Sequence, residues 1–287
     1  MLVGGFAAGV FGSLLGLGGG VLIVPLLTLG FGLDLRSAVG VSLVCVIMTS
    51  SAAAGVYLEK HVANLRLGMS LELFTAIGAL VGGSIAFLID ERILSGLFAL
   101  LLGYVAVSMI RGSGAGDTDG DATRDDEGEP AVDVDPMPVS AAQSVAPRLV
   151  ETRTAFLASV AGPGYEVRNL GTGIVGSTGA GVASALLGIG GGIVKVPLMH
   201  LAMGVPLRVA TATSNLMIGI TAAASAVIYL LRGEIDPYVA GPTAIGVFIG
   251  ATLGSRVSHR IPLGYLRWLF VAVLLYTAVQ MLRRAIA

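Results

Sequence analysis

Two glycine triplets carry the strongest chemical signal in this sequence, and each lies inside a long apolar segment. The first triplet ends at Gly20 and is followed by Pro25, and the second ends at Gly192 and is followed by Pro197. A glycine break inside such a segment leaves backbone groups that lipid cannot satisfy, so it is expected to line a cavity or to be packed in protein. A helix that restarts after the glycines directs its first N–H groups toward the protein interior, where they suit an anion. The pattern predicts helix breaks that include both prolines and an anion site shared by the two triplets.

Polar side chains near the second triplet fit the same chemistry. Lys195 follows the triplet in an otherwise apolar run, where an ionisable side chain indicates a functional site by default. The alternative is a lysine that reaches a membrane interface along its aliphatic stem. Ser214 and Asn215 on the next apolar segment suit an oxyanion, although such groups also satisfy neighbouring carbonyls in membrane helices. The candidate substrate-binding residues are Gly18, Gly19, Gly20, Gly190, Gly191, Gly192, Lys195, Ser214 and Asn215.

Other kinds of site find little support in the sequence. Neither triplet completes a dinucleotide fingerprint or a P-loop. The histidines are scattered and Cys45 has no partner, so no metal site is predicted. Glu72 and His200 lie near segment ends, and no proton relay is indicated. We therefore expect a protein that is not an enzyme and that uses no cofactor, no metal and no nucleic acid partner.

The segments that position these residues are duplicated. Matching residues recur 172 positions apart, and this register holds without a gap from Val3/Val175 to Val107/Val279. We call two residues related by this offset counterparts. Gly246, Gly250 and Gly254 stand at four-residue spacing, which is typical of close helix packing. The apolar stretches are about 2–31, 37–58, 67–89 and 93–110, then 173–203, 209–231, 238–258 and 263–282.

Composition indicates that the solvent of this chain is lipid. Hydrophobic residues make up 55% of the chain, charged residues only 12%, and the mean hydropathy is +0.88. We expect an all-α integral membrane protein with about eight transmembrane helices in two homologous four-helix halves, with a Gly/Pro-broken first helix in each. Four crossings per half would make the repeats parallel. If the triplets are re-entrant turns, each half has an odd number of crossings and the repeats are inverted.

A charged segment separates the two halves. Residues 117–135 hold nine acids and one base, a composition typical of a solvated, disordered tether. The expected domains are a first transmembrane repeat at 1–110, an acidic and largely disordered linker at 111–170, and a second repeat at 171–287. Counting Lys and Arg on alternate sides of an eight-helix arrangement places both termini and the linker in the cytoplasm, with the chain multi-pass in the cell membrane.

Three stretches together resemble a known family. Leu-Gly-Leu-Gly-Gly-Gly-x-x-x-Val-Pro at 15–25, its copy at 187–197, and the stretch 204–215 are similar to the TauE/SafE family of anion permeases. The resemblance implies a secondary transporter for sulfite, organosulfonates or related sulfur-containing anions, with the glycines and prolines in the family's repeated motif. The expected partners are the lipid bilayer and a small anionic substrate, and a homo-oligomer is left open. The alternative function is a non-transporting scaffold or accessory subunit of a membrane complex.

Overall fold

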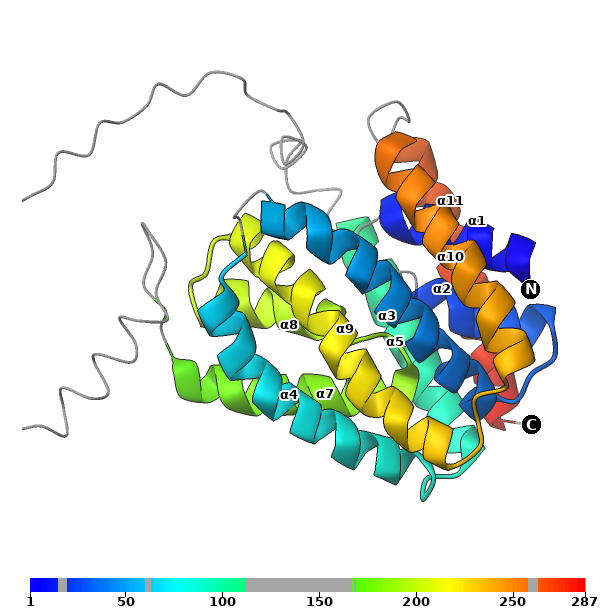
Figure 1. The fold of residues 1–287 in the computed structure, drawn as a ribbon. Helices are drawn as coiled ribbons and strands as arrows, with labels where there is room; N and C mark the ends of the chain where they lie inside the picture. Colours follow the sequence, from blue (N-terminus) through cyan, green and yellow to red (C-terminus); the bar gives the residue numbers. More distant parts are fainter. Residues whose placement is uncertain (15–19, 60–62, 112–166, 168, 258–262, 287) are drawn as a thin grey trace, which may run out of the picture.

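The computed structural model describes residues 1–14, 20–59, 63–111, 167, 169–257 and 263–286, and the regular structure in this part of the chain is helical (Figure 1). Long runs of apolar residues favour these helices, although most of the helices also contain glycines and Pro242 lies inside α10. The elements are α1 (Leu2–Leu14), α2 (Gly20–Pro25), the π-helical segment η1 (Leu26–Gly30), α3 (Leu35–Glu59), α4 (Leu65–Ala86), α5 (Glu91–Arg111), α7 (Leu170–Leu187), α8 (Gly192–Pro197), the π-helical segment η2 (Leu198–Ala202), α9 (Leu207–Leu231), α10 (Pro237–Val257) and α11 (Leu263–Ile286).

Six helices in the described ranges are long and apolar enough to cross a membrane, namely α3, α4, α5, α7, α9 and α10. The predicted all-α membrane class is confirmed. The expected number of about eight crossings is not confirmed, because α1 is only 13 residues long and α11 is not among the six.

Glycines allow two pairs of helices to pack at very short range. α1 lies along α10, and α4 lies along α7. A Cβ atom at Gly246 would collide with the carbonyl oxygen of Leu2, and one at Gly250 with that of Phe6. Gly78 of α4 approaches the backbone of Thr178 in the same way. The packing role predicted for the glycine row of α10 is confirmed at Gly246 and Gly250.

The segment that contains the second triplet doubles back on itself. The Nδ2 atom of Asn169, at the start of α7, donates to the carbonyl oxygen of Ala202, at the end of η2, at 3.4 Å. The glycine turn between these arms packs Gly191 against Ala180 of α7. The returning arm Gly192–Ala202 is about 16 Å long, roughly half of a bilayer core of about 30 Å. α7, α8 and η2 thus form a helical hairpin.

Pro25 and Pro197 lie at the ends of α2 and α8 and do not reverse the chain. Pro25 has φ −60° and ψ −39°, and Pro197 has φ −59° and ψ −37°, so both keep helical geometry. Each ends an α-helix and is followed by a π-helical segment. Proline lacks the N–H that the α-helical ladder needs, and a wider turn accommodates that loss. At each proline the α-helix therefore gives way to a π-helical segment, and in the second half the chain reversal occurs at the glycines.

The counterpart helices α3 and α9 run in opposite directions side by side. Ser37, near the start of α3, donates to Oε2 of Glu234, just beyond the end of α9, at 2.9 Å. Ser50, farther along α3, donates to the carbonyl oxygen of Asn215, near the start of α9, at 2.6 Å. Of the two arrangements left open by the sequence, these directions favour the inverted one.

The chain termini and the flanks of the acidic segment lie at opposite ends of the bundle. α5 starts beside the start of α3, where Glu91 accepts a hydrogen bond from the Leu35 N–H at 2.8 Å, and runs toward the far end. α7 begins at the end of the bundle opposite the start of α3. Figure 1 shows the N and C labels together at the other end, on the right of the view. The expectation that the linker shares one side with both termini does not fit this arrangement, in which the termini and the flanks of the acidic segment lie at opposite ends.

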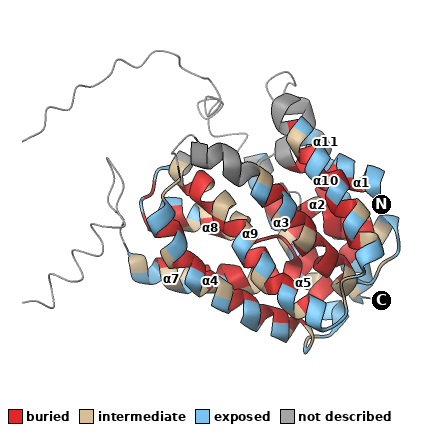
Figure 2. Cartoon of the chain, in the orientation of Figure 1, coloured by how far each residue is buried: buried red, intermediate tan, exposed pale blue. Residues whose placement is uncertain are grey.

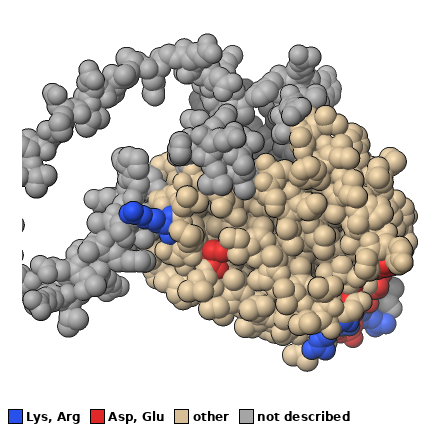
Figure 3. All heavy atoms as spheres, in the orientation of Figure 1, with Lys and Arg blue, Asp and Glu red and all other residues tan. Residues whose placement is uncertain are grey.

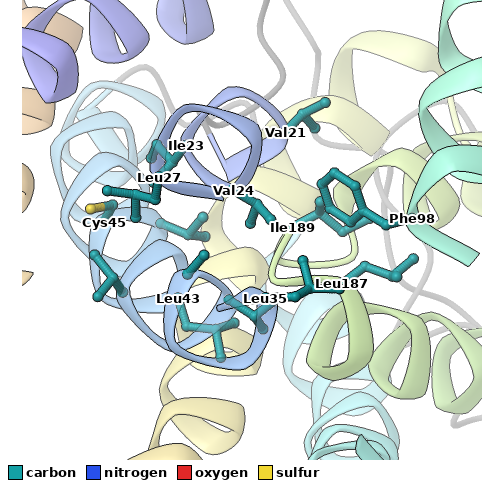
Figure 4. Close-up of a cluster of buried hydrophobic side chains, with 14 of the residues drawn as sticks. Val21, Ile23, Val24, Leu27, Leu35, Leu43, Cys45, Phe98, Leu187 and Ile189 are labelled. Atoms are coloured by element: carbon teal, nitrogen blue, oxygen red, sulfur yellow. The ribbon is translucent and has the colours of Figure 1, made fainter. Parts of the chain in front are cut away.

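The main apolar core gathers around α2 and the middle of α3. Ile23 and Val24 pack with Leu43, Cys45 and Ile189, and all five are buried (Figure 4). Cys45 is thus a packing residue, as predicted. Figure 2 shows buried residues along the inward faces of the helices, and large exposed apolar side chains cover the outside.

Charged side chains are almost absent from the middle of the molecular face over α3, α4 and α9. Figure 3 shows them mainly toward the ends of this face, with one small acidic area between. Exposed apolar side chains of these helices include Met69 and Leu73 of α4 and Ile220 of α9. An uncharged, apolar face of this size suits contact with lipid.

Candidate functional site

The turn after α7 depends on glycine for its backbone geometry. Gly188, Gly190 and Gly191 have φ angles of 68°, 74° and 76°. These values belong to the left-handed region, which costs about 1–2 kcal/mol for a residue with a Cβ atom. Gly192 then starts α8. The predicted break is confirmed at the second triplet, whereas Gly18 and Gly19 of the first triplet lie outside the described residues.

The two glycine segments meet beside α3. A Cβ atom on Gly20 would lie 2.8 Å from the carbonyl oxygen of Gly188, so the two backbones are in close contact. Ser42 of α3 joins them, because its hydroxyl lies 2.8 Å from the Gly188 carbonyl oxygen and 3.3 Å from that of Gly20. One hydroxyl proton is shared between two acceptors. The structure thus brings together Gly20 and the second triplet.

Two buried hydroxyls near the second triplet have no hydrogen-bond partner among the described residues. One belongs to Ser214, the counterpart of Ser42, and the other to Ser184 of α7. The Ser214 hydroxyl lies 3.7 Å from a Cβ position built on Gly192, and the Ser184 Cβ lies 3.4 Å from one built on Gly191. An unmade hydrogen bond at a buried hydroxyl costs about 1–3 kcal/mol. Both groups can therefore donate to a ligand at a net gain.

Ser184 was not identified from the sequence. Its counterpart is Gly12, so the signal was a hydroxyl that replaces a glycine in an otherwise similar segment. The same substitution occurs at Ser177, whose counterpart is Gly5 and whose buried hydroxyl likewise lacks a partner in the described part of the chain. The second half is thus more polar than the first at several matched positions.

Asn215 differs from its neighbour in where it lies. Its side chain is half-buried, and its backbone carbonyl oxygen accepts the hydrogen bond from the Ser50 hydroxyl on α3. Ser214 contacts the glycine turn instead. The described contacts place Asn215 on the α3 side of α9 and do not bring it to Gly192.

Lys195 lies inside a buried network of three side chains. Its ammonium donates to Oε2 of Glu72 at 2.8 Å and to the Thr221 hydroxyl at 2.7 Å. The Thr221 hydroxyl lies 2.6 Å from Oε1 of Glu72 and donates to it. The lysine side chain is 1% exposed and the glutamate 6%. The lysine does not reach an interface, and its charge is compensated by the carboxylate in this conformation.

The network ties three elements together around the second hairpin. Lys195 is on α8, one helical turn beyond Gly192, Glu72 is on α4 and Thr221 is on α9. Gly192 and Lys195 both face α9, where they contact Ser214 and Thr221 respectively. The network around Lys195 and the unpartnered Ser214 hydroxyl thus lie one helical turn apart along the same contact between α8 and α9.

Glu72 is a second functional candidate that sequence reasoning missed. Its position near the start of an apolar segment suggested an interface, but the α4 helix begins at Leu65 and carries Glu72 two turns inward. The carboxylate is the only acidic group of α4. A single acid in a predicted membrane segment, matched by Ala244 in the other half, was the available signal.

Glu72 also lines a cavity between α4 and α9. The cavity has a volume of about 290 Å³ and begins beside Ala63 and Asn64, at the start of α4. Thr213 contributes a hydroxyl that accepts from the Asn64 N–H at 2.9 Å. The full lining is Ala63, Asn64, Leu65, Gly68, Met69, Glu72, Leu73, Ala76, Thr213, Leu216, Met217 and Ile220.

Comparison with known proteins agrees with these features. The family model described as sulfite exporter TauE/SafE matches residues 1–281. The chain belongs to the TauE/SafE family. The glycine turn described above lies within the matched region.

Relatives of this TauE/SafE chain carry transporter names. The probable membrane transporter protein YunE of Bacillus subtilis is 24% identical over 91% of this chain and 88% of its own length. The probable membrane transporter protein MJ0441 of Methanocaldococcus jannaschii is 25% identical over 96% of this chain and 91% of its own. Sulfite exporter TauE/SafE family protein 3 of Arabidopsis thaliana is 24% identical over 90% of this chain and 71% of its own. No solved structure gives a significant match.

Proposed function

We propose that this TauE/SafE chain is a secondary transporter of a small anion, with sulfite and organosulfonates as the substrate class. The chain is a multi-pass membrane protein of a transporter family, and the family description and one relative's name refer to sulfite export. The substrate class rests on these names together with the chemistry of the buried site. Transport by such a protein is a change between conformations and forms no covalent bond.

The site that supports this proposal is the glycine turn of the second hairpin. Its main support is the pair of buried, unpartnered hydroxyls of Ser184 and Ser214, which lie beside Gly191 and Gly192. Hydroxyl donors suit the oxygens of a sulfite or sulfonate. We include Gly18, Gly19 and Gly20 of the first segment, because Gly20 contacts the second turn at Gly188.

We propose alternating access between two inverted repeats as the mechanism. The suggested repeats are residues 1–110 and 171–287, and the residues between them form the acidic linker. The opposite directions of α3 and α9 support the inversion, and the matched pairs α1 with α10 and α4 with α7 support a two-fold relation between the repeats. The second hairpin then enters from one side of the membrane and returns to it, and Gly20 of the first segment meets its glycine turn at mid-depth.

The proposal is tested with the full chain purified and reconstituted into liposomes. Uptake of radiolabelled sulfite, methanesulfonate, taurine and chloride is measured against empty vesicles. We expect saturable uptake of at least one sulfur anion and a higher KM for it in Ser184→Ala and Ser214→Ala. Gly179→Ala serves as a matched control, because a Cβ atom at this α7 position has nothing within 4 Å.

The scaffold alternative predicts a different outcome of the same assay. A correctly folded chain that gives no saturable flux with any of the four anions would contradict transport. Flux of chloride alone would retain a transporter and contradict the sulfur substrate class.

A further inference from the structure

The buried pair formed by Lys195 and Glu72 is not needed to build this fold. The counterpart of Lys195 is Ile23, which is fully buried, and the counterpart of Glu72 is Ala244, which is 4% exposed. The first half therefore fills the matching positions with apolar side chains on helices that pack in the same way. Exchange of a buried ion pair for apolar residues is often neutral or stabilising. A role beyond stability is indicated for the pair.

The two members of the pair differ in their access to the outside. Glu72 lines the cavity between α4 and α9, and Lys195 does not. The cavity lining on the α4 side runs from Ala63 to Ala76, and Glu72 lies about 12 Å along the helix axis from Asn64. The carboxylate thus lies between the cavity on one side and the ammonium on the other.

The lysine in turn lies next to the proposed substrate site. It is one helical turn from Gly192 on the same helix, and both residues face α9. Its ammonium is engaged by Glu72 and Thr221 in this conformation. A substrate anion at the glycine turn could pair with the Lys195 ammonium only after the Glu72 carboxylate has become neutral.

We propose that Glu72 is the proton-coupling residue of this transporter. A proton that enters through the cavity binds the Glu72 carboxylate and gives a neutral acid. The Lys195 ammonium keeps its own proton, loses its counter-charge and becomes available to the anion at the glycine turn. One proton and one monovalent anion then move together, and the buried site stays neutral in both states. This inference rests on the transporter function proposed above.

Few other charges face Glu72. α7 carries no charged residue, and in α9 the only one is Arg208 at its start. On α4 itself the other charged residue is Arg66, at the first turn. His200 lies on η2, where Nδ1 contacts the Val205 carbonyl oxygen at 2.9 Å. Lys195 is therefore the one charged group in direct contact with the carboxylate in the described structure.

The test uses the full chain in proteoliposomes and measures anion and proton movement together. The probe is methanesulfonate, whose charge does not change with pH in the working range, and a trapped pH indicator reports protons. In the wild type we expect a proton gradient to drive methanesulfonate accumulation and each addition of methanesulfonate to move protons. Glu72→Gln should lose both effects but keep exchange of labelled for unlabelled methanesulfonate, because exchange needs no net change in protonation. Asp34→Asn, at an exposed helix start, is the control that should match the wild type.

A double variant protects the test against misfolding. Glu72→Ala with Lys195→Ile copies the apolar counterparts of the first half and should fold, yet show neither proton movement nor methanesulfonate accumulation. Proton-coupled uptake that persists in Glu72→Gln or in the double variant overturns the inference. Wild-type methanesulfonate flux without proton movement also overturns it but leaves the transporter function intact. Absence of any anion flux in the wild type contradicts the transporter function itself.

Discussion

The ammonium of Lys195 and the carboxylate of Glu72 lie 2.8 Å apart, although they are more than a hundred residues apart in the chain. One is on the hairpin arm α8 and the other on α4. The contact therefore ties a short helix that cannot cross the membrane alone to one that is long enough to do so. If the second hairpin moves relative to α4, the ion pair of Lys195 and Glu72 must either break or be kept by movement of both side chains.

The pair should show strong coupling in stability. Lys195→Ala leaves the Glu72 charge buried without a partner, and we expect a loss of roughly 3–5 kcal/mol of stability. Glu72→Ala should cost a similar amount. The double variant that combines Lys195→Ala with Glu72→Ala should be more stable than either single variant, because neither buried charge remains. Thermal unfolding in detergent measures this, and additive losses in the double variant would contradict the pairing.

Ser42 and Ser214 form a matched pair with opposite expectations. Ser42→Ala removes the donor shared by the carbonyl oxygens of Gly188 and Gly20, and we expect it to lower stability by about 1–3 kcal/mol. Ser214→Ala removes a hydroxyl without a partner in the described structure and should leave stability equal or slightly higher. Its effect should fall on anion affinity instead. Equal destabilisation by both substitutions would show that Ser214 has a structural role.

The glycines of α10 should respond to substitution according to their contacts. Gly246→Ala adds a Cβ atom against the Leu2 backbone and should destabilise the chain by about 1–3 kcal/mol. Gly241→Ala, on the same helix, adds one where nothing lies within 4 Å, and it should be neutral or stabilising. Unfolding in detergent compares the two. A harmless Gly246→Ala would argue against the close contact of α1 and α10.

Inverted repeats place the termini and the acidic segment on opposite sides of the membrane. The native Cys45 is buried and can be replaced by serine, which gives a background for single cysteines. A cysteine at position 284 and one at position 131 should then react with an impermeant thiol reagent from opposite sides of sealed vesicles. Labelling of both from one side would support the parallel arrangement.

The sequence was most informative where the two halves match. The triplet with its proline predicted a break, and the 172-residue offset identified Ser42 and Ser214 as counterparts. Composition alone predicted the helical membrane class. The direction of the repeats stayed open, because a glycine run has the same sequence whether the helix continues beyond it or turns back.

The partner of Lys195 was not foreseen for a physical reason. Glu72 is near Lys195 only because α4 packs along α7, and that contact depends on glycines such as Gly78 and Gly181 that allow the backbones to approach. No local pattern around either residue contains this information. That the Ser184 hydroxyl lacks a hydrogen-bond partner could not be predicted from the sequence either, because it depends on which acceptor groups α8 and α9 place near this hydroxyl.

The most direct test of the whole account is the initial rate of radiolabelled sulfite uptake into proteoliposomes as a function of sulfite concentration. The account predicts a saturable rate above that of empty vesicles, with competition by methanesulfonate and a raised KM in Ser214→Ala. A rate that rises linearly with concentration and equals that of empty vesicles would contradict it.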